Sequence, residues 1–482
     1  MKHDTAPLFE SLRQFVEREQ APFYSPGHKG GRTLDPWFRD HIAAIDLNNL
    51  PDTDTLHCPE GPILEAERLI ADAWGVGQSF ILVQGSTSGN ITVALSALRP
   101  DEPVLIARNA HKSVLAGLVQ VGARPVWLEP RWDDRFGVAH GIDADVVERA
   151  FRDSGAKALW VLHPTYYGTT GDIAALAELS RRHDATLLVD GAHSPHFAFH
   201  PDLPTPGESA GAAATVQSVH KILSGLSQAA VLHIDPEVLD PASVRRGLQL
   251  VQTTSPHFAI MASIDLARRE MMLHGRDLLD QALQRARNAA TRLAAIPGLR
   301  VLRPDDLAGA GTGLHQLDET KLLIGTSGLA ADARGIVERL NRVHGVQPEL
   351  SGTGHVLCIS TIGNTDEDFE RLVAGFAEVA RHAGRTSAGA KTGLIGDLLA
   401  VRPETVLTPR EAFFAADEAV SLQATAGRIA AEAITPYPPG IPLVMPGERL
   451  DADVIDLLLA LRNAGNPISA SDPTMEQVLV VR

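Results

Sequence analysis

One lysine of the chain lies in a segment that would alter its chemistry. Lys221 has Val216, Val219, Ile222 and Leu223 as apolar neighbours in the sequence. Burial among such residues would disfavour the ammonium form and lower the pKa of the amine. A neutral amine attacks an aldehyde to form an imine, so Lys221 is a candidate for covalent attachment of a carbonyl compound. Considered alone, Lys221 fits better a surface lysine whose stem covers apolar side chains.

A carboxylate follows one of the predicted strands. Asp190 comes directly after the apolar segment 185–189. Ligands of open α/β sheets bind at the carboxyl ends of the strands. An aspartate with its ordinary pKa of about 3.9 is ionised at neutral pH and can keep a pyridine nitrogen protonated. Considered alone, Asp190 is better explained as a helix cap or a loop residue.

Residues 85–90, Gly-Ser-Thr-Ser-Gly-Asn, are predicted to form a loop between a strand and a helix. Small residues let backbone N–H groups approach an anion, and a helix start adds partial positive charge. The hydroxyls of Ser86, Thr87 and Ser88 would add donors. The segment is therefore a candidate phosphate site, and a tight turn with a helix cap is an equal alternative.

The three features follow one another within one predicted α/β region. An anion site, an acid at a strand end and a lysine beyond it match the phosphate, ring nitrogen and aldehyde of pyridoxal 5'-phosphate (PLP). Their order is the one that PLP enzymes of fold type I require. We predict that Lys221 carries PLP as a Schiff base and that Asp190 holds the ring nitrogen. The protonated ring would then be the electron sink for a carbanion at the substrate Cα.

Alternating strands and helices must position these residues. Apolar patterns predict helices at 63–74, 91–98, 113–121 and 173–182, and strands at 80–83, 104–107, 158–162 and 185–189. Such alternation implies a mostly parallel sheet with helices on both faces. A long helical pattern at 262–295 follows, and the alternation then returns, with strands at 321–324 and 356–359 and helices at 336–343 and 366–380.

These patterns divide the chain into four predicted parts. They are an N-terminal arm or linker at 1–50, a large PLP-binding domain at 51–285, a small α/β domain at 286–385 and a C-terminal domain at 394–482, with a small, polar linker at 383–391.

Composition excludes several classes of protein. A hydrophobic fraction of 44% and a charged fraction of 21% are those of an ordinary globular chain. The formal net charge of −16 argues against nucleic acid as a partner. Cys58 and Cys358 form no disulfide framework or zinc motif, and we expect two reduced thiols. We see no signal peptide and no apolar run long enough to span a membrane, so a cytoplasmic location is expected.

Short motifs spread over the chain carry a family resemblance. They are 26–31 (PGHKGG), 57–63 (HCPEGPI), 108–113 (RNAHKS), 164–168 (PTYYG), 190–193 (DGAH), 218–221 (SVHK), 253–256 (TTSP), 407–412 (LTPREA) and 437–442 (YPPGIP). In this order they resemble the Orn/Lys/Arg decarboxylases of fold type I. The resemblance implies an α/β, aspartate-aminotransferase-like fold, PLP as cofactor, and decarboxylation of lysine, ornithine or arginine to a diamine or agmatine.

The resemblance also implies roles for single residues. His111 would stack on the PLP ring, and Thr254 would approach the cofactor phosphate from the neighbouring subunit of a homodimer or higher oligomer. His193 would either orient Asp190 or be a buried histidine bonded to backbone. The predicted catalytic residues are Lys221, Asp190, His111 and His220, no metal site is predicted, and the predicted cofactor-binding residues are Ser86, Thr87, Ser88, His111, Asp190, His193, Ser218, His220, Lys221 and Thr254.

The sequence departs from the family at three positions near the predicted site. Gly191 replaces the usual Glu, Ser194 a usual Gly, and Phe258 a common Tyr. These changes keep other PLP reactions open: transamination, retro-aldol cleavage or oxidation. A PLP-binding regulator or inactive scaffold is a further alternative, against which the retained Lys221 and Asp190 argue. The length leaves no room for the N-terminal receiver-like domain of large members, so the chain resembles the short form.

Two roles stay open at this point. The proton returned to Cα could come from Lys221, His220 or His111, and the sequence does not rank them. The distal cationic group of a basic substrate needs an acidic or polar acceptor. Three carboxylates in or beside the matched motifs are candidates, although each is better explained by itself as a solvated surface group: Glu60, Glu411 and Glu448.

Overall fold

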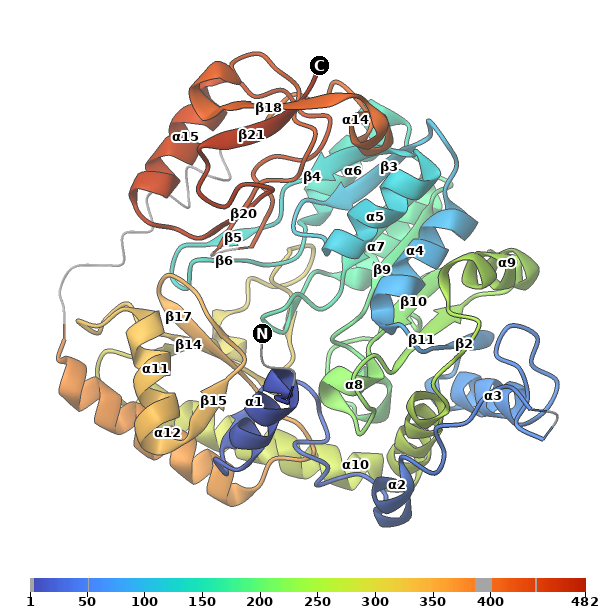
Figure 1. The fold of residues 1–482 in the computed structure, drawn as a ribbon, viewed down its shortest axis with the longest axis vertical. Helices are drawn as coiled ribbons and strands as arrows, with labels where there is room; N and C mark the ends of the chain where they lie inside the picture. Colours follow the sequence, from blue (N-terminus) through green and yellow to red (C-terminus); the bar gives the residue numbers. More distant parts are fainter. Residues whose placement is uncertain (1–3, 51, 386–400, 438–439) are drawn as a thin grey trace.

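The computed structural model of the chain describes residues 4–50, 52–385, 401–437 and 440–482 (Figure 1). A seven-stranded sheet forms the centre of its larger part. The strand order is β2 (Gln78–Leu82), β11 (Ala230–Ile234), β10 (Ala214–Gln217), β9 (Thr186–Asp190), β7 (Ala158–Leu162), β3 (Pro103–Ala107) and β4 (Arg124–Leu128). Neighbouring strands from β10 to β4 run parallel, and β11 is antiparallel to both of its neighbours. The predicted α/β fold with a mostly parallel sheet is therefore confirmed.

Helices cover both faces because successive residues of a strand point to opposite sides. On β3, Val104 and Ile106 pack in one core with α4 (Gly85–Ala97), α5 (Lys112–Val121) and α9 (Pro241–Val251). Leu105 and Ala107 pack in another core with α6 (Ala144–Ser154) and α7 (Ile173–Arg182). Both faces of each central strand are therefore apolar, as in parallel sheets generally.

The structure corrects the prediction for residues 85–90. They are not a loop; they form the first turns of α4, which begins at Gly85. Gly85 has a positive φ of 72° and turns the chain out of the strand. The Ser88 hydroxyl then donates to the Gly85 carbonyl at 2.8 Å, so a hydroxyl-rich sequence typical of a loop is accommodated inside the helix start.

A second, antiparallel sheet has the order β12 (Arg300–Val301), β14 (Lys321–Gly325), β17 (His355–Ile359) and β16 (Leu350–Ser351). Helices α11 (Ala333–His344) and α12 (Asp366–Ala383) pack in its core. The N-terminal strand β1 (Ala21–Phe23) pairs in parallel with β15 (Val346–Pro348), and its fully buried Phe23 belongs to the same core. The N-terminal segment is thus part of this packed unit.

One helix joins the two sheets. α10 (Phe258–Ala294) is 37 residues long, and apolar residues of its first two thirds, such as Leu279 and Leu283, pack with the large sheet. Ala289 and Leu293 near its end pack with the second sheet. Two further helices, α3 (Pro62–Trp74) and the four-residue α8 (Val219–Ile222), lie on the α10 side of the large sheet (Figure 1).

Residues 401–437 and 440–482 form a third packed unit beside β3, β4 and α5 (Figure 1). Its core lies between the helix α15 (Ala452–Asn463) and the antiparallel pair of β18 (Asp417–Ser421) and β21 (Gln477–Val481). The unit also contains α14 (Pro409–Phe414), β19 (Thr435–Pro436) and β20 (Ile468–Ser469). The predicted linker at 383–391 lies mostly outside the described residues.

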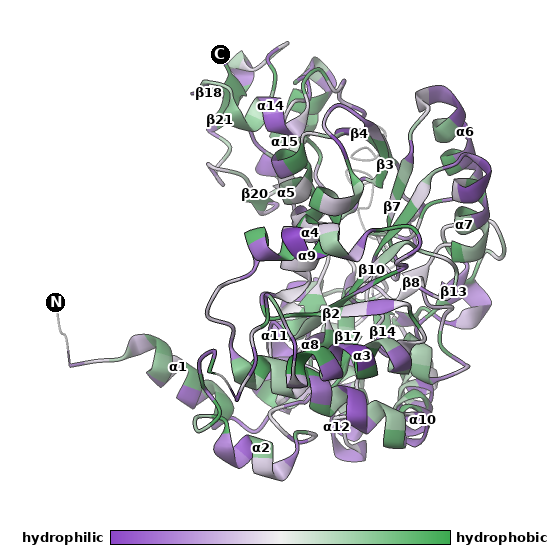
Figure 2. Cartoon of the chain, turned by 90° about the vertical axis from the view of Figure 1, so that its right-hand side faces the viewer, coloured by the Kyte–Doolittle hydropathy of each residue, from purple (hydrophilic) through white to green (hydrophobic). Residues whose placement is uncertain are grey.

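Short elements complete the chain. They are α1 (Pro7–Val16), α2 (Pro36–His41), the pair β5 (Trp132–Asp133) and β6 (Val138–Ala139), and the pair β8 (Thr169–Thr170) and β13 (Gln316–Leu317). α1 buries none of its side chains and extends away from the rest of the molecule (Figure 2). Within the described ranges, no helix has both the length and the apolar character needed to cross a membrane.

Candidate active site

Asp190 ends β9 at the carboxyl edge of the large sheet, where its side chain is buried. Its Oδ2 accepts a hydrogen bond of 2.9 Å from Asn90 Nδ2, and its Oδ1 accepts one of 3.2 Å from the backbone N–H of Ala192. The two donors hold the carboxylate in one orientation. Sequence reasoning did not identify Asn90 as the partner, because one turn of α4 separates it from the hydroxyls that drew attention.

Lys221 lies on α8, and its amine is buried within the protein. Burial lowers the pKa of Lys221 to about 8, although the negative charges of Asp190 and then Glu349 act in the opposite direction. The amine therefore lies within electrostatic reach of Asp190. No carboxylate in the described part of the chain is close enough to form an ion pair with it. Lys221 thus combines a lowered pKa with the nearness to Asp190 that the predicted cofactor site requires.

His193 has neither of its two predicted partners. Its Nε2 lies 3.0 Å from Lys221 Nζ, and its Nδ1 is buried without a hydrogen-bond partner in the described structure. Burial, with the positive charge of Lys221, keeps the pKa of His193 well below its usual value. The neutral ring therefore accepts from the Lys221 ammonium, and it neither orients Asp190 nor bonds to backbone. Chain neighbours suggested the wrong partner because the turn after β9 directs residue 193 toward α8.

His111 is the N-cap residue of α5, and its Nδ1 accepts from the backbone N–H of Ser113 at 3.2 Å. The Ser113 hydroxyl lies 2.8 Å from the same nitrogen and also accepts from Asn90 Nδ2 at 2.9 Å. Burial lowers the pKa of His111, and the charge of Asp190 partly offsets this. A continuous chain of polar contacts therefore joins His111 to Asp190 through Ser113 and Asn90, and it holds the ring in one orientation.

His220 precedes Lys221 on α8, and its ring is bonded to the backbone. Its Nδ1 lies 2.9 Å from the carbonyl oxygen of Ala229, to which it donates. Burial lowers the pKa of His220 to about 4. The imidazole is therefore neutral at physiological pH and fixed by backbone, which makes a positioning role for α8 the simplest reading of His220.

The predicted phosphate residues share one corner of the site. Ser86, in the first turn of α4, lies with its Oγ 2.7 Å from the Oγ of Ser218, which precedes α8. Thr87 is exposed, whereas the Ser88 hydroxyl is occupied by the Gly85 carbonyl. The start of α4 thus offers backbone N–H groups with the hydroxyls of Ser86, Thr87 and Ser218 nearby, which suits an anion. Ser88 contributes through its backbone alone.

Thr254 is exposed on the segment that precedes α10. The backbone N–H of the preceding Thr253 donates to the side chain of Gln84, the N-cap residue of α4, at 2.6 Å. This segment therefore lies beside the same helix start within one chain. The predicted contact of Thr254 with a neighbouring subunit stays a prediction.

Two of the departures from the family are linked in space. A Cβ added at Gly191 would lie 2.6 Å from the Oγ of Ser194, whose hydroxyl donates to the Gly191 carbonyl at 2.8 Å. It would also lie 3.0 Å from Thr215 Cγ2. The serine therefore fills the space that a side chain at position 191 would need, and the two changes depend on each other.

The three acids considered for a distal cation are engaged elsewhere or remote. Glu411 caps α14 through Thr408, and Glu60 is exposed beside Asp54. Glu448 is fully buried and binds Arg108 with both oxygens at 2.8 Å. None of the three carboxylates lies beside Lys221, since the contacts that hold them belong to other parts of the fold.

Tyr166, which sequence reasoning noted only as part of a motif, lies at the site. Its ring centre is 5.9 Å from Lys221 Nζ and 4.6 Å from that of His193. The turn that carries it is fixed by a hydrogen bond from Thr165 N to Thr169 O and by a contact of 2.7 Å between their hydroxyls. Tyr166 therefore forms one rigid wall beside the amine.

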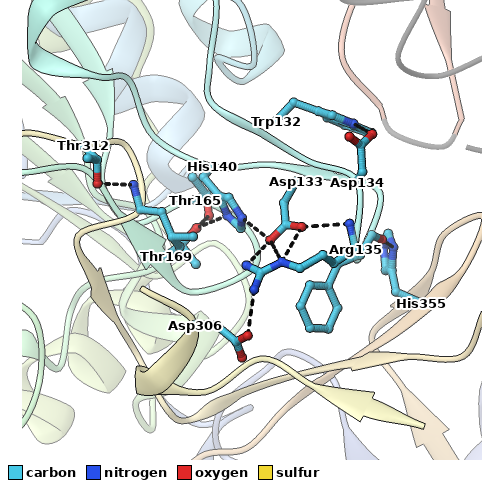
Figure 3. Close-up of polar contacts among 12 residues, drawn as sticks. Trp132, Asp133, Asp134, Arg135, His140, Thr165, Thr169, Asp306, Thr312 and His355 are labelled. Atoms are coloured by element: carbon cyan, nitrogen blue, oxygen red, sulfur yellow. Dashed lines mark hydrogen bonds and ion pairs between the residues drawn. The ribbon is translucent and has the colours of Figure 1, made fainter. Parts of the chain in front are cut away.

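A polar network around the buried His140 ring contacts this turn at Thr169, as Figure 3 shows. The His140 ring lies between Thr169 Oγ1, at 2.9 Å from Nδ1, and Asp133 Oδ2, at 3.3 Å from Nε2. Asp133 in turn accepts from the guanidinium of Arg135, which also donates to Asp306 at 2.7 Å. The β5–β6 pair and the turn that joins its strands thus connect the Tyr166 turn to Asp306, which follows β12 of the second sheet.

The chain is similar to known proteins over its whole length. The family model described as Orn/Lys/Arg decarboxylase, major domain, matches residues 6–368, and that of the C-terminal domain matches residues 393–469. An arginine decarboxylase of Bacillus subtilis is 33% identical over 100% of this chain and 98% of its own length. The constitutive lysine decarboxylase of Escherichia coli is 26% identical over 96% of this chain and 78% of its own length.

Solved structures agree with the fold. The structure of the Escherichia coli constitutive lysine decarboxylase matches with a TM-score of 0.78 and 24% identity, over 99% of this chain and 82% of that one. A ureidoglycine–glyoxylate aminotransferase of Bacillus subtilis matches with a TM-score of 0.58 and 15% identity, over 78% of this chain and 98% of that one. The aspartate-aminotransferase-like fold expected from the motifs is confirmed.

Fold and similarities together define an amino acid decarboxylase built on the fold-type-I architecture. Within that class, the chain belongs to the Orn/Lys/Arg decarboxylase family. The predicted family and the predicted enzyme class are thereby confirmed.

The residues present fit the cofactor that this architecture implies. A buried carboxylate at a strand end, a lysine that forms no ion pair with any described residue and a hydroxyl-bearing helix start surround one place in the fold. The buried, unpartnered Nδ1 of His193 is a further polar group that the protein alone leaves unsatisfied. The donor set therefore matches an aldehyde, a pyridine nitrogen and a phosphate.

Proposed function

We propose that this chain uses PLP to decarboxylate a basic amino acid and that arginine is its preferred substrate. The observation that carries the proposal is the pair formed by Lys221 and Asp190. The amine has a pKa of about 8 and lies within electrostatic reach of a buried carboxylate that two donors hold in place. This pairing of a reactive amine with a fixed acid is what PLP chemistry needs.

Each residue has a proposed role toward the cofactor. Lys221 would bind the aldehyde, Asp190 the ring nitrogen, and the start of α4 with Ser86, Thr87 and Ser218 the phosphate. When bound, PLP supplies an electron sink for the electrons that remain at Cα as CO2 departs. Asn90 keeps Asp190 oriented through its 2.9 Å hydrogen bond.

Protons are the other requirement of the reaction. The Lys221 amine, with its pKa of about 8, can both donate and accept a proton near neutral pH, which favours it for returning the proton to Cα. His220 has its Nδ1 proton committed to a backbone carbonyl. His193, which accepts from the Lys221 amine, would keep that amine aimed into the site.

Arginine is favoured among the basic substrates by the relatives. The full-length relatives at 32–33% identity are named arginine decarboxylases, whereas those named lysine decarboxylases are 24–26% identical and longer than this chain. The wider structural likeness to aminotransferases concerns the fold alone, and function resides in the site.

We also propose a homodimer, in which Thr254 of one subunit approaches the phosphate of the other.

The test is a substrate panel with the purified protein. Arginine, lysine and ornithine are supplied with PLP, and CO2 and the amine product are measured by mass spectrometry. We expect agmatine from arginine at the highest kcat/KM. Release of CO2 from none of the three would contradict the proposal. A visible absorbance band that borohydride reduction removes should be present in the wild type and absent in Lys221→Ala.

A further inference from the structure

Glu349 is a fourth acid, and it lies within electrostatic reach of Lys221, whereas the three candidates from the sequence do not. It stands between β15 (Val346–Pro348) and β16 (Leu350–Ser351), and its backbone N–H donates to the Leu357 carbonyl at 3.0 Å. Because β15 also pairs with β1, the backbone on both sides of Glu349 is held by strands. A side chain on such a support can be placed accurately.

The carboxylate of Glu349 is bonded to two neutral donors. Its Oε1 accepts from the Tyr166 hydroxyl at 2.6 Å, and its Oε2 accepts from the backbone N–H of Ser25 at 2.8 Å. Within 4–50, 52–385, 401–437 and 440–482, no lysine, arginine or histidine forms an ion pair with it. Each oxygen of an ionised carboxylate can accept more than one hydrogen bond, so lone pairs remain for a ligand. Glu349 is also only partly buried, which leaves one side of it accessible.

Tyr166 places this carboxylate at the active site. Its hydroxyl touches Glu349, and the centre of its ring lies 5.9 Å from Lys221 Nζ. Glu349 is therefore separated from the Lys221 amine by the width of one aromatic side chain. The α-amino group of a basic amino acid must react where Lys221 lies, and its charged end lies several bonds further on. The spacing suits a substrate that spans the face of Tyr166, and an aromatic ring favours a cation beside it.

The other carboxylates around the site already have partners. Asp318 binds Lys321 at 3.2 Å, Asp368 binds Arg32 at 2.6 Å, and Asp190 is held by donors at the sheet edge. Within the described ranges, Glu349 alone among these four has neither a direct ion pair nor a proposed cofactor partner. Its charge also raises the pKa of the buried Lys29, Lys221 and Lys321, so Glu349 lies within electrostatic reach of the site.

We infer that Glu349 binds the distal cationic group of the substrate, a guanidinium or an ammonium, with Tyr166 as the adjacent wall. The inference rests on the proposed function, because it names how the same site selects a basic substrate. A carboxylate and a guanidinium form charge-assisted hydrogen bonds, which are among the strong ones in proteins. Binding would also give the Glu349 carboxylate a direct ion-pair partner, which it lacks among the residues that the structure describes.

The experiment compares Glu349→Gln with wild type and with the control Glu370→Gln. Glu370 lies on α12 of the same unit and pairs with Arg292 at the surface. Calorimetry measures the Kd of agmatine, which retains the guanidinium but lacks the carboxylate. Steady-state kinetics measure arginine against citrulline, which has a similar shape without the charge. In Glu349→Gln we expect at least a tenfold increase in the Kd of agmatine and in the KM of arginine. We expect kcat/KM for citrulline, and all values of Glu370→Gln, to stay within about threefold.

Two results would overturn the inference. One is an unchanged ratio of arginine to citrulline kcat/KM in Glu349→Gln, and the other is an unchanged Kd of agmatine. If Glu349→Gln is insoluble, Glu349→Asp serves instead, since it keeps the charge but withdraws it by one methylene. A KM for arginine raised severalfold in Glu349→Asp supports the inference, and an unaltered one refutes it. A wild type that releases no CO2 from any basic amino acid refutes the proposed function, whereas the agmatine Kd still decides the role of Glu349.

Discussion

The ion pair between Arg108 and Glu448 joins the third packed unit to the large sheet. The two side chains are 6% and 0% exposed, and two parallel hydrogen bonds of 2.8 Å connect them. Arg108 also donates to the Leu443 carbonyl at 2.7 Å, and Glu448 accepts from the N–H of Met445 at 2.8 Å. Arg108 lies three residues before His111, so this junction also fixes the backbone that leads into the site.

Glu448→Gln would remove the carboxylate that binds Arg108 directly, and the nearby charge of Glu129 would compensate the buried guanidinium only in part. Removal of one partner from a buried pair costs about 3–5 kcal/mol, because the remaining charge stays desolvated. We expect about 3 kcal/mol here, since the glutamine oxygen can still accept one of the two hydrogen bonds. The control is Glu404→Gln, which removes the partner of Arg449 from a pair that is 39% and 69% exposed. An exposed pair contributes about 0–1 kcal/mol.

Urea unfolding gives the midpoints, and hydrogen exchange with mass spectrometry localises the change. In Glu448→Gln, amides of α15 and of the strands beside it should exchange faster, while amides of β7 and β9 at the centre of the large sheet keep their protection. Replacement of both partners, Arg108→Met with Glu448→Leu, should recover much of the lost stability. Equal midpoint shifts in Glu448→Gln and Glu404→Gln would refute this reasoning, because burial would then not be the source of the energy.

Three further predictions concern the site. The rate at which the cofactor-free protein takes up PLP should rise with pH through about 8, since only the neutral Lys221 amine attacks an aldehyde; a midpoint near that of an ordinary lysine would contradict the lowered pKa. Asn90→Leu removes a donor to the Asp190 carboxylate, a bond worth about 1.5–3 kcal/mol, so kcat/KM for decarboxylation should fall about 10- to 100-fold, and a change under twofold would count against the role. Gly191→Ala should cost about 1–3 kcal/mol in unfolding experiments and less in a Ser194→Gly background; a double-mutant cycle without coupling would disprove the spatial link.

Regular segments of the fold were predictable where the apolar pattern is long and bounded. The predicted strand 158–162 and helix 173–182 have the same bounds as β7 and α7. In contrast, β10 and β11 were not predicted, because short apolar strands at 214–217 and 230–234 lie among small residues that carry no clear period. The predicted start of α4 was also wrong. Gly, Ser and Thr by themselves favour loops, whereas contacts within the fold hold residues 85–90 in a helix.

At the site, local patterns indicated reactive residues but not the residues that contact them. Asp190 and Lys221 were proposed as site residues because a strand end and an apolar flank are local features. His193 was assigned to Asp190 as a chain neighbour, yet the structure places its Nε2 against Lys221 Nζ. Glu448 was considered for substrate binding, but it binds Arg108, which is remote in sequence. The sequence contains no local signal for either pairing.

The sequence by itself determined the class of fold, the family and the residue types that can react, since these follow from local periodicity and short motifs. Only the tertiary structure decided which carboxylate lies near Lys221, which histidine contacts its amine, and which acid has no ion-pair partner among the described residues. Charge, burial and hydrogen bonding act over a few ångström in space, and the bonded residues here are separated by 28 to 324 positions in the sequence. Tyr166, Ser25 and Glu349 meet for this reason, although no pattern along the chain connects them.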